Sequence, residues 1–195
     1  MNKKNEHELR NSIKIDKINP GNRIEPGNVI IGLESSGIHS NGLTLAREVL
    51  LGKTKEEQKA NLNNCDEAFR DSLGMELLHP TKIYVAEILE LMDSIDVKGM
   101  AHITGGGFTN LNRFAVDNVC FLIESNFPIP PLFRLIQDRG KISNAEMYEV
   151  FNMGIGFCVI LDRADSDKAI RIFEKHGTSS SVIGCVTNGN GKEVI

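Results

Sequence analysis

The stretch GLESSGIHSNG, residues 32–42, joins two contrasting patterns in the chain. The three residues before it, 29–31, are Val-Ile-Ile, an apolar run typical of a strand. After it, Leu43, Ala46 and Leu50 repeat at the spacing of one helix face. The sequence therefore predicts a strand, then a turn of small residues, then the start of a helix.

Several features of this turn favour the binding of an anion. The first backbone N–H groups of a helix have no partner within it, and the helix dipole favours negative charge there. Ser35, Ser36, Ser40 and Asn41 add short hydrogen-bonding side chains, and His39 could change its charge near neutral pH. A simple helix cap, with Ser40 or Asn41 as the N-cap residue, explains the same pattern. Both interpretations stay open on the pattern alone.

The composition places the chain among ordinary globular proteins. Its 195 residues suffice for one domain with a sizeable core, and 41% of them are hydrophobic and 25% charged. With a net charge of −4, the chain lacks the excess of positive charge that is typical of nucleic-acid-binding proteins, which argues against nucleic acid as a partner. No apolar run approaches the roughly 20 residues that span a bilayer, and residues 1–11 are too polar for a secretory signal. We therefore expect no membrane partner and a cytoplasmic protein.

The four cysteines, Cys65, Cys120, Cys158 and Cys185, are scattered and form no CxxC pair. Three of them lie in apolar runs typical of strands, which favours buried free thiols over zinc ligands or disulfides. Free thiols persist in a reducing compartment. The cysteines therefore agree with a cytoplasmic location, and we expect no metal ligands among the site residues.

The apolar runs at residues 119–123 and 155–161 lack polar alternation, which predicts strands covered on both faces. Amphipathic segments lie around them. We expect Pro80 to start one helix, residues 128–131 to lead into another and Ser143 to cap a third. Strands and helices interleave without strict alternation. The pattern predicts an α/β fold with a mixed (α+β) sheet, in a three-layer α/β/α domain.

Two further glycine-rich turns, at residues 101–107 and 151–156, also stand at junctions between strands and helices. Such junctions build anion-binding nests in α/β folds. His102 lies in the first of them. A lone loop histidine is more often a structural hydrogen-bonding group, and nearness in space does not follow from sequence. The residues by themselves indicate a site for a phosphorylated small molecule.

These turns lie within motifs that resemble those of one enzyme family. SSGIHSNG at 35–42, LLHPTKIYV at 77–85 and AHITGGG at 101–107 resemble the motifs S-S-G-x-H-S-N-G, L-L-x-P-T-[RK]-I-Y-V and A-H-I-T-G-G-G. The family is aminoimidazole ribonucleotide synthetase, also called phosphoribosylformylglycinamidine cyclo-ligase. PPLFR at 130–134 and the run 147–156 continue the series in family order. Five ordered motifs make a specific resemblance.

The resemblance covers residues 13–195 and only the C-terminal domain of the family. It implies that residues 1–27 are an arm and leading segment, a remnant of or link to an absent N-terminal ATP-binding domain, and that 28–195 are the synthetase C-terminal domain. The family's N-L-P-R appears at residues 110–113 as Asn-Leu-Asn-Arg, without the proline. His79 falls at a variable family position, so no role is assigned to it.

The resemblance implies an ATP-dependent ring closure in purine (IMP) biosynthesis. Formylglycinamidine ribonucleotide would be phosphorylated on its amide oxygen. An internal nitrogen would then attack that carbon and expel phosphate, giving aminoimidazole ribonucleotide. The expected catalytic residues are His39 and His102, which would orient the amide or move a proton. The expected substrate- and phosphate-binding residues are Ser35, Ser36, Gly37, Ser40, Asn41, Gly42, Thr104, Gly105, Gly106, Gly107, Asn152 and Gly154.

The cofactors implied by the resemblance are ATP and Mg²⁺, held mostly by the absent N-terminal domain. The implied partners are that domain and a second copy of the chain in a homodimer. Two alternatives stay open. One is a related superfamily member: formylglycinamidine synthase, selenophosphate synthetase, thiamine-phosphate kinase or a hydrogenase maturation protein. The other is a non-catalytic module that binds a nucleotide or a partner. The joint presence of the three motif turns favours the cyclo-ligase.

Overall fold

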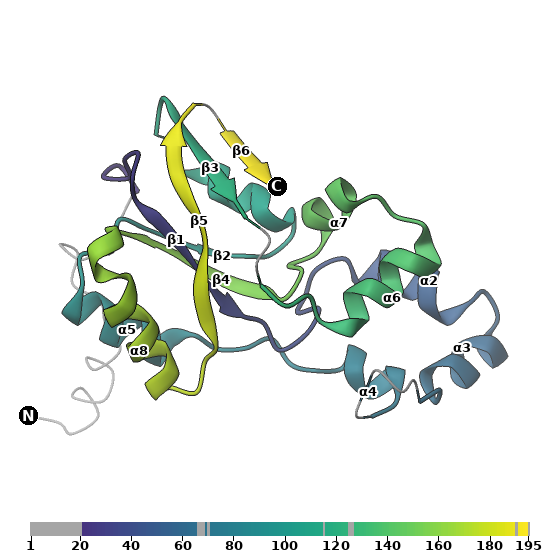
Figure 1. The fold of residues 1–195 in the computed structure, drawn as a ribbon. Helices are drawn as coiled ribbons and strands as arrows, with labels where there is room; N and C mark the ends of the chain where they lie inside the picture. Colours follow the sequence, from purple (N-terminus) through teal and green to yellow (C-terminus); the bar gives the residue numbers. More distant parts are fainter. Residues whose placement is uncertain are drawn as a thin grey trace, which may run out of the picture.

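A computed structural model describes residues 21–65, 69, 71–114, 116–124 and 127–189, and the backbone of 191–194. Most of the arm expected at residues 1–27 lies outside the described residues. Figure 1 shows a sheet with helices packed on it and a second group of helices to one side. The described chain therefore has a sheet region and a helical region.

Within the described residues, six strands form one sheet in the order β2-β4-β1-β5-β3-β6. The neighbouring strands are antiparallel except for the parallel pair β3 and β6. The strands are β1 Val29–Glu34, β2 Gly99–His102, β3 Val119–Ile123, β4 Ile155–Leu161, β5 Ser180–Asn188 and β6 Gly191–Val194. The predicted mixed sheet is thus confirmed, and β6 is a strand that the sequence did not indicate.

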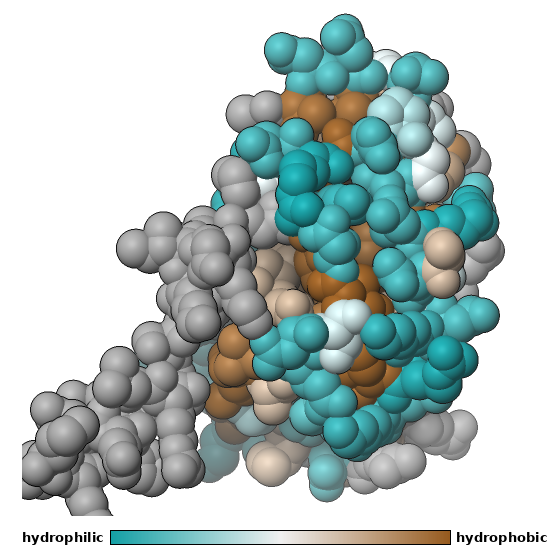
Figure 2. Space-filling model, turned by 90° about the vertical axis from the view of Figure 1, so that its left-hand side faces the viewer, coloured by the Kyte–Doolittle hydropathy of each residue, from teal (hydrophilic) through white to brown (hydrophobic). Residues whose placement is uncertain are grey.

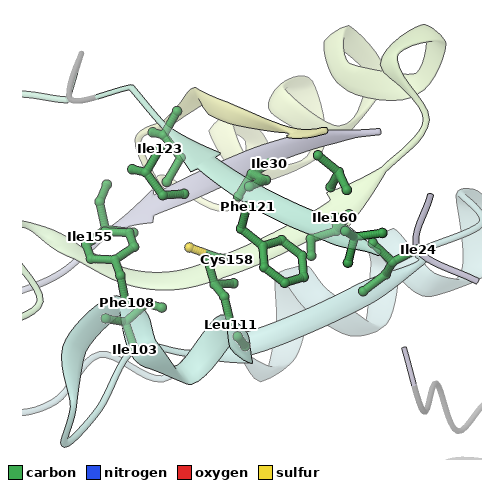
Figure 3. Close-up of a cluster of buried hydrophobic side chains, with 14 residues drawn as sticks. Ile24, Ile30, Ile103, Phe108, Leu111, Phe121, Ile123, Ile155, Cys158 and Ile160 are labelled. Carbon is green, nitrogen blue, oxygen red and sulfur yellow. The ribbon is translucent and has the colours of Figure 1, made fainter. Parts of the chain in front are cut away.

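Helices cover both faces of this sheet. Helices α5 (Val85–Ser94) and α8 (Ser166–Lys175) lie side by side on one face, where they pack on alternate side chains of β1 and β4. The 3₁₀ helix η2 (Gly107–Arg113) covers the other face, and its side chains point toward the strands, Phe108 beside Ile155 and Leu111 beside Cys158 (Figure 3). The three-layer arrangement follows from these two apolar clusters.

The face carrying α5 and α8 is mostly hydrophilic. In Figure 2, which looks at the left-hand side of Figure 1, hydrophilic side chains surround a narrower strip of apolar ones. This pattern fits amphipathic helices whose apolar stripe faces the sheet. Glu87 of α5 is an exception, because it is 4% exposed and accepts a hydrogen bond of 3.1 Å from Thr178 Oγ1.

The second helical group lies beyond the C-terminal end of β1 (Figure 1). Its core is formed by the apolar faces of several helices, with Leu50, Phe133, Met147 and Phe151 among the buried side chains. Ser143 caps α7 by accepting from the Glu146 N–H, as its position in the sequence predicts. The helices are α2 Leu43–Leu51, α3 Lys55–Leu62, α4 Leu73–Leu77, α6 Pro131–Gly140 and α7 Asn144–Val150, and a short 3₁₀ helix η3, Arg163–Asp165, precedes α8.

Two sequence predictions are wrong in detail. Residues 155–161 are almost wholly buried, but in β3 only alternate residues are, with Cys120 and Leu122 half-buried. β3 lies beyond the strands that α5 and α8 cover. The helix expected from Pro80 begins at Val85 instead. Residues 79–84 belong to no helix or strand, and the Pro80 carbonyl and the Lys82 N–H make hydrogen bonds with residues of the 35–42 turn.

The cysteines are free, as expected, but their burial varies. Cys158 is fully buried, whereas Cys120 and Cys185 are half-buried and Cys65 is exposed. Burial raises the pKa of the Cys158 thiol, which therefore behaves as a small apolar core residue.

Candidate functional site

Three strands bring the predicted turns together at one end of the sheet. β4 lies between β1 and β2 and runs antiparallel to both. The ends of β1 and β2 therefore lie beside the start of β4. Glu34 pairs with Ile155, and His102 pairs with Phe157. The turns that follow β1 and β2 and the turn that precedes β4 thus converge.

Asn152 joins two of these turns. Its side chain is fully buried, and Nδ2 donates a hydrogen bond of 2.9 Å to the carbonyl of Gly37. Oδ1 accepts from Ser35 Oγ at 3.1 Å and from the Gly154 N–H at 2.9 Å. Asn152, predicted as a ligand-binding residue, therefore holds the 35–42 turn in place with its own amide.

Further hydrogen bonds fix the 35–42 turn against its neighbours. Asn41 is 4% exposed, and its Nδ2 donates to the Ile103 carbonyl at 3.2 Å, which links this turn to the 101–107 turn. Ser36 Oγ donates to the Pro80 carbonyl at 2.6 Å. Ser40 is exposed, so it is the side chain of this set that faces solvent most openly.

Helix α2 starts without a side-chain cap. Gly42 is its N-cap residue, in the left-handed region with φ of 65°, and no side chain caps it. The alternative in which Ser40 or Asn41 is the N-cap is therefore wrong. A Cβ at Gly42 would collide with the Phe151 ring, which explains the glycine. The N-terminal N–H groups of α2 remain without a capping side chain.

The two predicted catalytic histidines are neighbours. The ring centroids of His39 and His102 are 6.2 Å apart, and both rings lie about as far from Tyr84, at 6.5 and 6.1 Å. His39 is 5% exposed, whereas His102 is exposed. His39 also has a left-handed backbone, with φ of 54°, a conformation that L residues seldom adopt outside constrained sites.

A cavity of about 350 Å³ opens beside His102. Its size falls in the range typical of small-ligand sites. His102 stacks on Phe157 with ring centroids 5.9 Å apart, and Tyr84 lies 5.4 Å from Phe157. His39 is not among the residues that line the cavity. The lining residues are Lys82, Ile83, Tyr84, Val85, Ile88, Leu89, His102 and Phe157.

The glycine turn before η2 presents backbone N–H groups. Asn110 is buried, and its Nδ2 donates to the carbonyls of Thr104, Gly105 and Gly107. The carbonyls are thereby held toward Asn110. Among the described residues, the N–H groups of Gly105 and Gly106 have no acceptor, and space around Gly105 is open. This arrangement resembles an anion-binding nest.

The structure adds Glu34, Lys82, Tyr84, Gly156 and Phe157 to the predicted site residues. Lys82 Nζ donates to Glu34 Oε1 at 2.9 Å, and Tyr84 Oη donates to the Glu34 carbonyl at 2.7 Å. Lys82 and Tyr84 belong to the LLHPTKIYV motif, which was therefore a signal for both. Nothing in the sequence pattern marks Phe157, because its role depends on pairing with His102.

Electrostatics at the site favour neutral rings. Burial, followed by the nearby charges of His102 and Lys82, lowers the pKa of His39 to about 4. Burial also lowers the pKa of His102 and raises that of Tyr84. Burial opposes ionisation of Glu34, but hydrogen bonds from Lys82 and Ser179 outweigh it and lower the pKa of that carboxyl. At neutral pH, Glu34 is charged and Tyr84 keeps its proton.

The described residues contain no group of three or more His, Cys, Asp or Glu side chains placed to hold a metal ion. No helix among the described residues is long and apolar enough to cross a membrane.

The fold and these turns define a domain of the AIR synthase type. Residues 25–195 match the family "AIR synthase related protein, C-terminal domain", and the chain belongs to this family.

Curated relatives of this chain are named phosphoribosylformylglycinamidine cyclo-ligase. The protein of Methanococcus maripaludis strain C7 is 46% identical over 172 residues, which are 88% of this chain and 48% of the relative. The protein of Carboxydothermus hydrogenoformans is 44% identical over 184 residues, 94% of this chain and 52% of the relative. The chain thus spans about half the length of the curated relatives it matches.

Solved structures share the fold at low sequence identity. A thiamine-monophosphate kinase from Stenotrophomonas maltophilia matches 93% of this chain and 54% of its own, with a TM-score of 0.62 and 19% identity. E. coli HypE, a hydrogenase maturation protein, matches 89% of this chain and 48% of its own chain, with a TM-score of 0.59 and 18% identity. T. maritima PurL complexed with FGAR matches 94% of this chain and 28% of its own chain, with a TM-score of 0.56 and 16% identity. At these identities the likeness concerns the fold alone.

Proposed function

We propose that this chain is the C-terminal half of an ATP-dependent phosphoribosylformylglycinamidine cyclo-ligase of purine biosynthesis. The observation that carries the proposal is the convergence of the 35–42, 101–107 and 151–156 turns, with His39 and His102 6.2 Å apart. The identity of 46% to a named cyclo-ligase supports it. In this proposal residues 28–195 are the synthetase domain and residues 1–27 lead into it.

The proposed reaction closes a ring in two steps. The amide oxygen of formylglycinamidine ribonucleotide takes the terminal phosphoryl group of ATP, and ADP leaves. An internal nitrogen then attacks the activated carbon, the C–O bond breaks and phosphate departs. Negative charge moves with the phosphoryl group in both steps, so backbone donors that are already fixed in place stabilise it without rearranging.

The chain offers two sets of such donors. The uncapped N-terminus of α2 follows the 35–42 turn, and the N–H groups of Gly105 and Gly106 lie in the second turn. We assign phosphate or substrate binding to these turns. Asn152 and Asn41 act there by holding the backbone, because their amides are occupied by the turns themselves. We assign contact with the reacting amide, or movement of a proton, to His102, and its position in the lining of the cavity supports this.

ATP is the proposed phosphoryl donor. The structural neighbours include T. maritima PurL complexed with ATP or with FGAR and HypE in complex with ATP, which supports nucleotide use in this fold. In this proposal Mg²⁺ and much of the nucleotide are held by another domain, since the relatives are about twice as long as the matched part.

The proposed partners are an N-terminal synthetase domain and a second copy of the chain in a homodimer, in the cytoplasm. Ile83 is 79% exposed and Val85 is 59% exposed, and both line the cavity beside His102. Exposed apolar side chains gathered around a cavity are typical of a contact surface. The length of the relatives supports a further domain as the partner that covers it.

The test is ADP release in the presence of formylglycinamidine ribonucleotide and ATP. The relatives' N-terminal half is expressed separately, and each half is assayed alone and then mixed. We expect turnover only in the mixture, since half a site cannot hold both reactants in line. Turnover by this chain alone would contradict the two-domain proposal. If mixing restores no turnover although the halves bind each other, the alternative of a non-catalytic module is favoured.

A further inference from the structure

The imidazole of His39 is enclosed by fixed groups. It is 5% exposed and lies against the backbone of Gly156, where an added Cβ would come within 2.6 Å of His39 Cε1 and would also collide with Tyr84 Oη. Glycine at this position therefore allows both rings to approach the strand. The ring has little freedom to turn, so its hydrogen bonds define its protonation.

Two backbone N–H groups point at the same ring nitrogen. The N–H of Ser36 donates to His39 Nε2 at 3.1 Å, and the N–H of Lys82 donates to it at 3.4 Å. A backbone N–H can only donate, so Nε2 must present its lone pair. Ser36 Oγ also lies 3.1 Å from Nε2, but its proton goes to the Pro80 carbonyl at 2.6 Å. Nε2 is therefore an acceptor and carries no proton.

We propose that His39 is held as the neutral tautomer with its proton on Nδ1, and that it is a positioning residue whose Nε2 fixes the N–H groups of Ser36 and Lys82 at the site. It does not shuttle protons. This inference rests on the proposed function for the reaction that the site carries out, and on the hydrogen bonds of the chain itself for the tautomer. Proton transfer, where the reaction requires it, is left to His102.

The Nδ1 atom carries the ring proton. It is buried and has no hydrogen-bond partner among the described residues. Buried donors in native proteins are nearly always paired, but no acceptor among the described residues selects this tautomer at Nδ1. The two backbone donors at Nε2 select it instead.

The surrounding charges disfavour a charged ring. His102 and Lys82 face His39, and the Lys82 ammonium is paired with Glu34. The third ionisable neighbour, Tyr84, is neutral because burial raises its pKa. Protonation of His39 would place a second N–H against the donors of Ser36 and Lys82. The lowered pKa of His39, about 4, agrees with this geometry.

Nitrogen NMR on the full chain with ¹⁵N-labelled histidine tests the tautomer. Long-range ¹H–¹⁵N correlations distinguish a protonated ring nitrogen from one with a free lone pair, and His39→Asn assigns the signals. We expect Nδ1 protonated and Nε2 unprotonated, with no change between pH 8 and pH 5. A ring protonated on Nε2, or one that titrates above pH 6, would overturn the proposal. Ser36→Ala is the matched control, because it keeps both backbone donors and should leave the tautomer unchanged.

Activity of the mixed halves tests the positioning role separately. A glutamine side chain places a carbonyl oxygen near the position of Nε2, so His39→Gln should retain about tenfold more turnover than His39→Ala. Equal losses in both variants would refute the positioning role. Absence of turnover in the unmodified mixture would instead contradict the proposed function, while the NMR result on the chain alone would still decide the tautomer.

Discussion

The hydroxyl of Tyr84 donates a hydrogen bond of 2.7 Å to the main-chain carbonyl of Glu34, across 50 residues of sequence. This bond ties the segment 79–84 to the end of β1, where the 35–42 turn begins. The same segment supplies the Lys82 N–H to His39 and the Lys82 ammonium to the Glu34 carboxylate. Tyr84 therefore organises the site although it was not among the predicted site residues.

Removal of this bond should lower the stability of the fold modestly and disturb the surroundings of His39. Tyr84→Phe keeps the ring but loses the donor, and we expect the free energy of unfolding to fall by about 1 kcal/mol. Urea denaturation measures this change. Chemical shifts of His39 should move in the same variant, because the segment that carries the Lys82 N–H loses an anchor. An unchanged His39 spectrum would show that the segment is held by other contacts.

A side chain at Gly156 should disturb both rings. Its Cβ would overlap Tyr84 and crowd His39, so Gly156→Ala should lower the free energy of unfolding by about 1–3 kcal/mol. Gly105→Ala is the control, because a Cβ there meets nothing within 4 Å. That variant should change stability by no more than about 0.5 kcal/mol. Similar losses in both variants would contradict the packing described for Gly156.

Truncation of Asn152 should loosen the 35–42 turn. Asn152→Ala removes three hydrogen bonds and leaves the buried Gly37 carbonyl without this donor. We expect a loss of about 2–3 kcal/mol in stability and weaker binding of phosphate, measured by urea denaturation and calorimetry. Asn63→Ala, at an exposed position, should cost no more than about 0.5 kcal/mol. Intact phosphate binding in the Asn152 variant would place that site elsewhere.

Stability should fall as the pH drops from about 6.5 to about 4. The folded pKa of His39 lies below its ordinary value, so in this window the unfolded chain binds more protons and is favoured. His102 contributes in the same direction, and the carboxyl of Glu34 adds to the loss at the acidic end. The effect of His39 is on the order of 1–3 kcal/mol. His39→Asn should reduce the pH dependence of the free energy of unfolding, measured by denaturation at several pH values. An unchanged pH dependence in this variant would assign the loss of stability to other groups.

A charge at the cavity rim should block the partner domain. Ile83→Glu introduces a carboxylate at a position that is 79% exposed, so the melting temperature should change little. Turnover of the mixed halves should fall at least about tenfold at limiting concentrations, since an unpaired charge would be buried at the contact. Leu78→Glu, at a position that is 74% exposed and outside the cavity, is the matched control. Equal effects of the two variants would argue against this surface as the contact.

Much of the local structure could be predicted from the sequence. The strand at residues 29–31, the turn at 35–42, the cap at Ser143 and the buried strand at 155–161 follow from spacing and residue type, which act over a few neighbouring residues. The same local patterns identified the three turns that converge. They also pointed to His39 and His102 as a pair worth testing.

The tertiary structure decided which of the competing local interpretations holds. Gly42 ends up as the N-cap because the Phe151 ring occupies the space beside it. The helix expected at Pro80 starts at Val85, because residues 80–84 make hydrogen bonds with the 35–42 turn and β1 instead. β3 has a half-buried face because it lies outside the reach of α5 and α8.

The protonation of His39 shows most clearly what the sequence determined and what only the tertiary structure decided. The sequence determined that a histidine stands in a turn of small residues, which are free to adopt unusual backbone angles. Only the folded chain brings the N–H of Lys82, 43 residues away, to the same nitrogen as the N–H of Ser36. A proton's position depends on donors and acceptors within about 3 Å, and such distances arise from packing between elements remote in sequence.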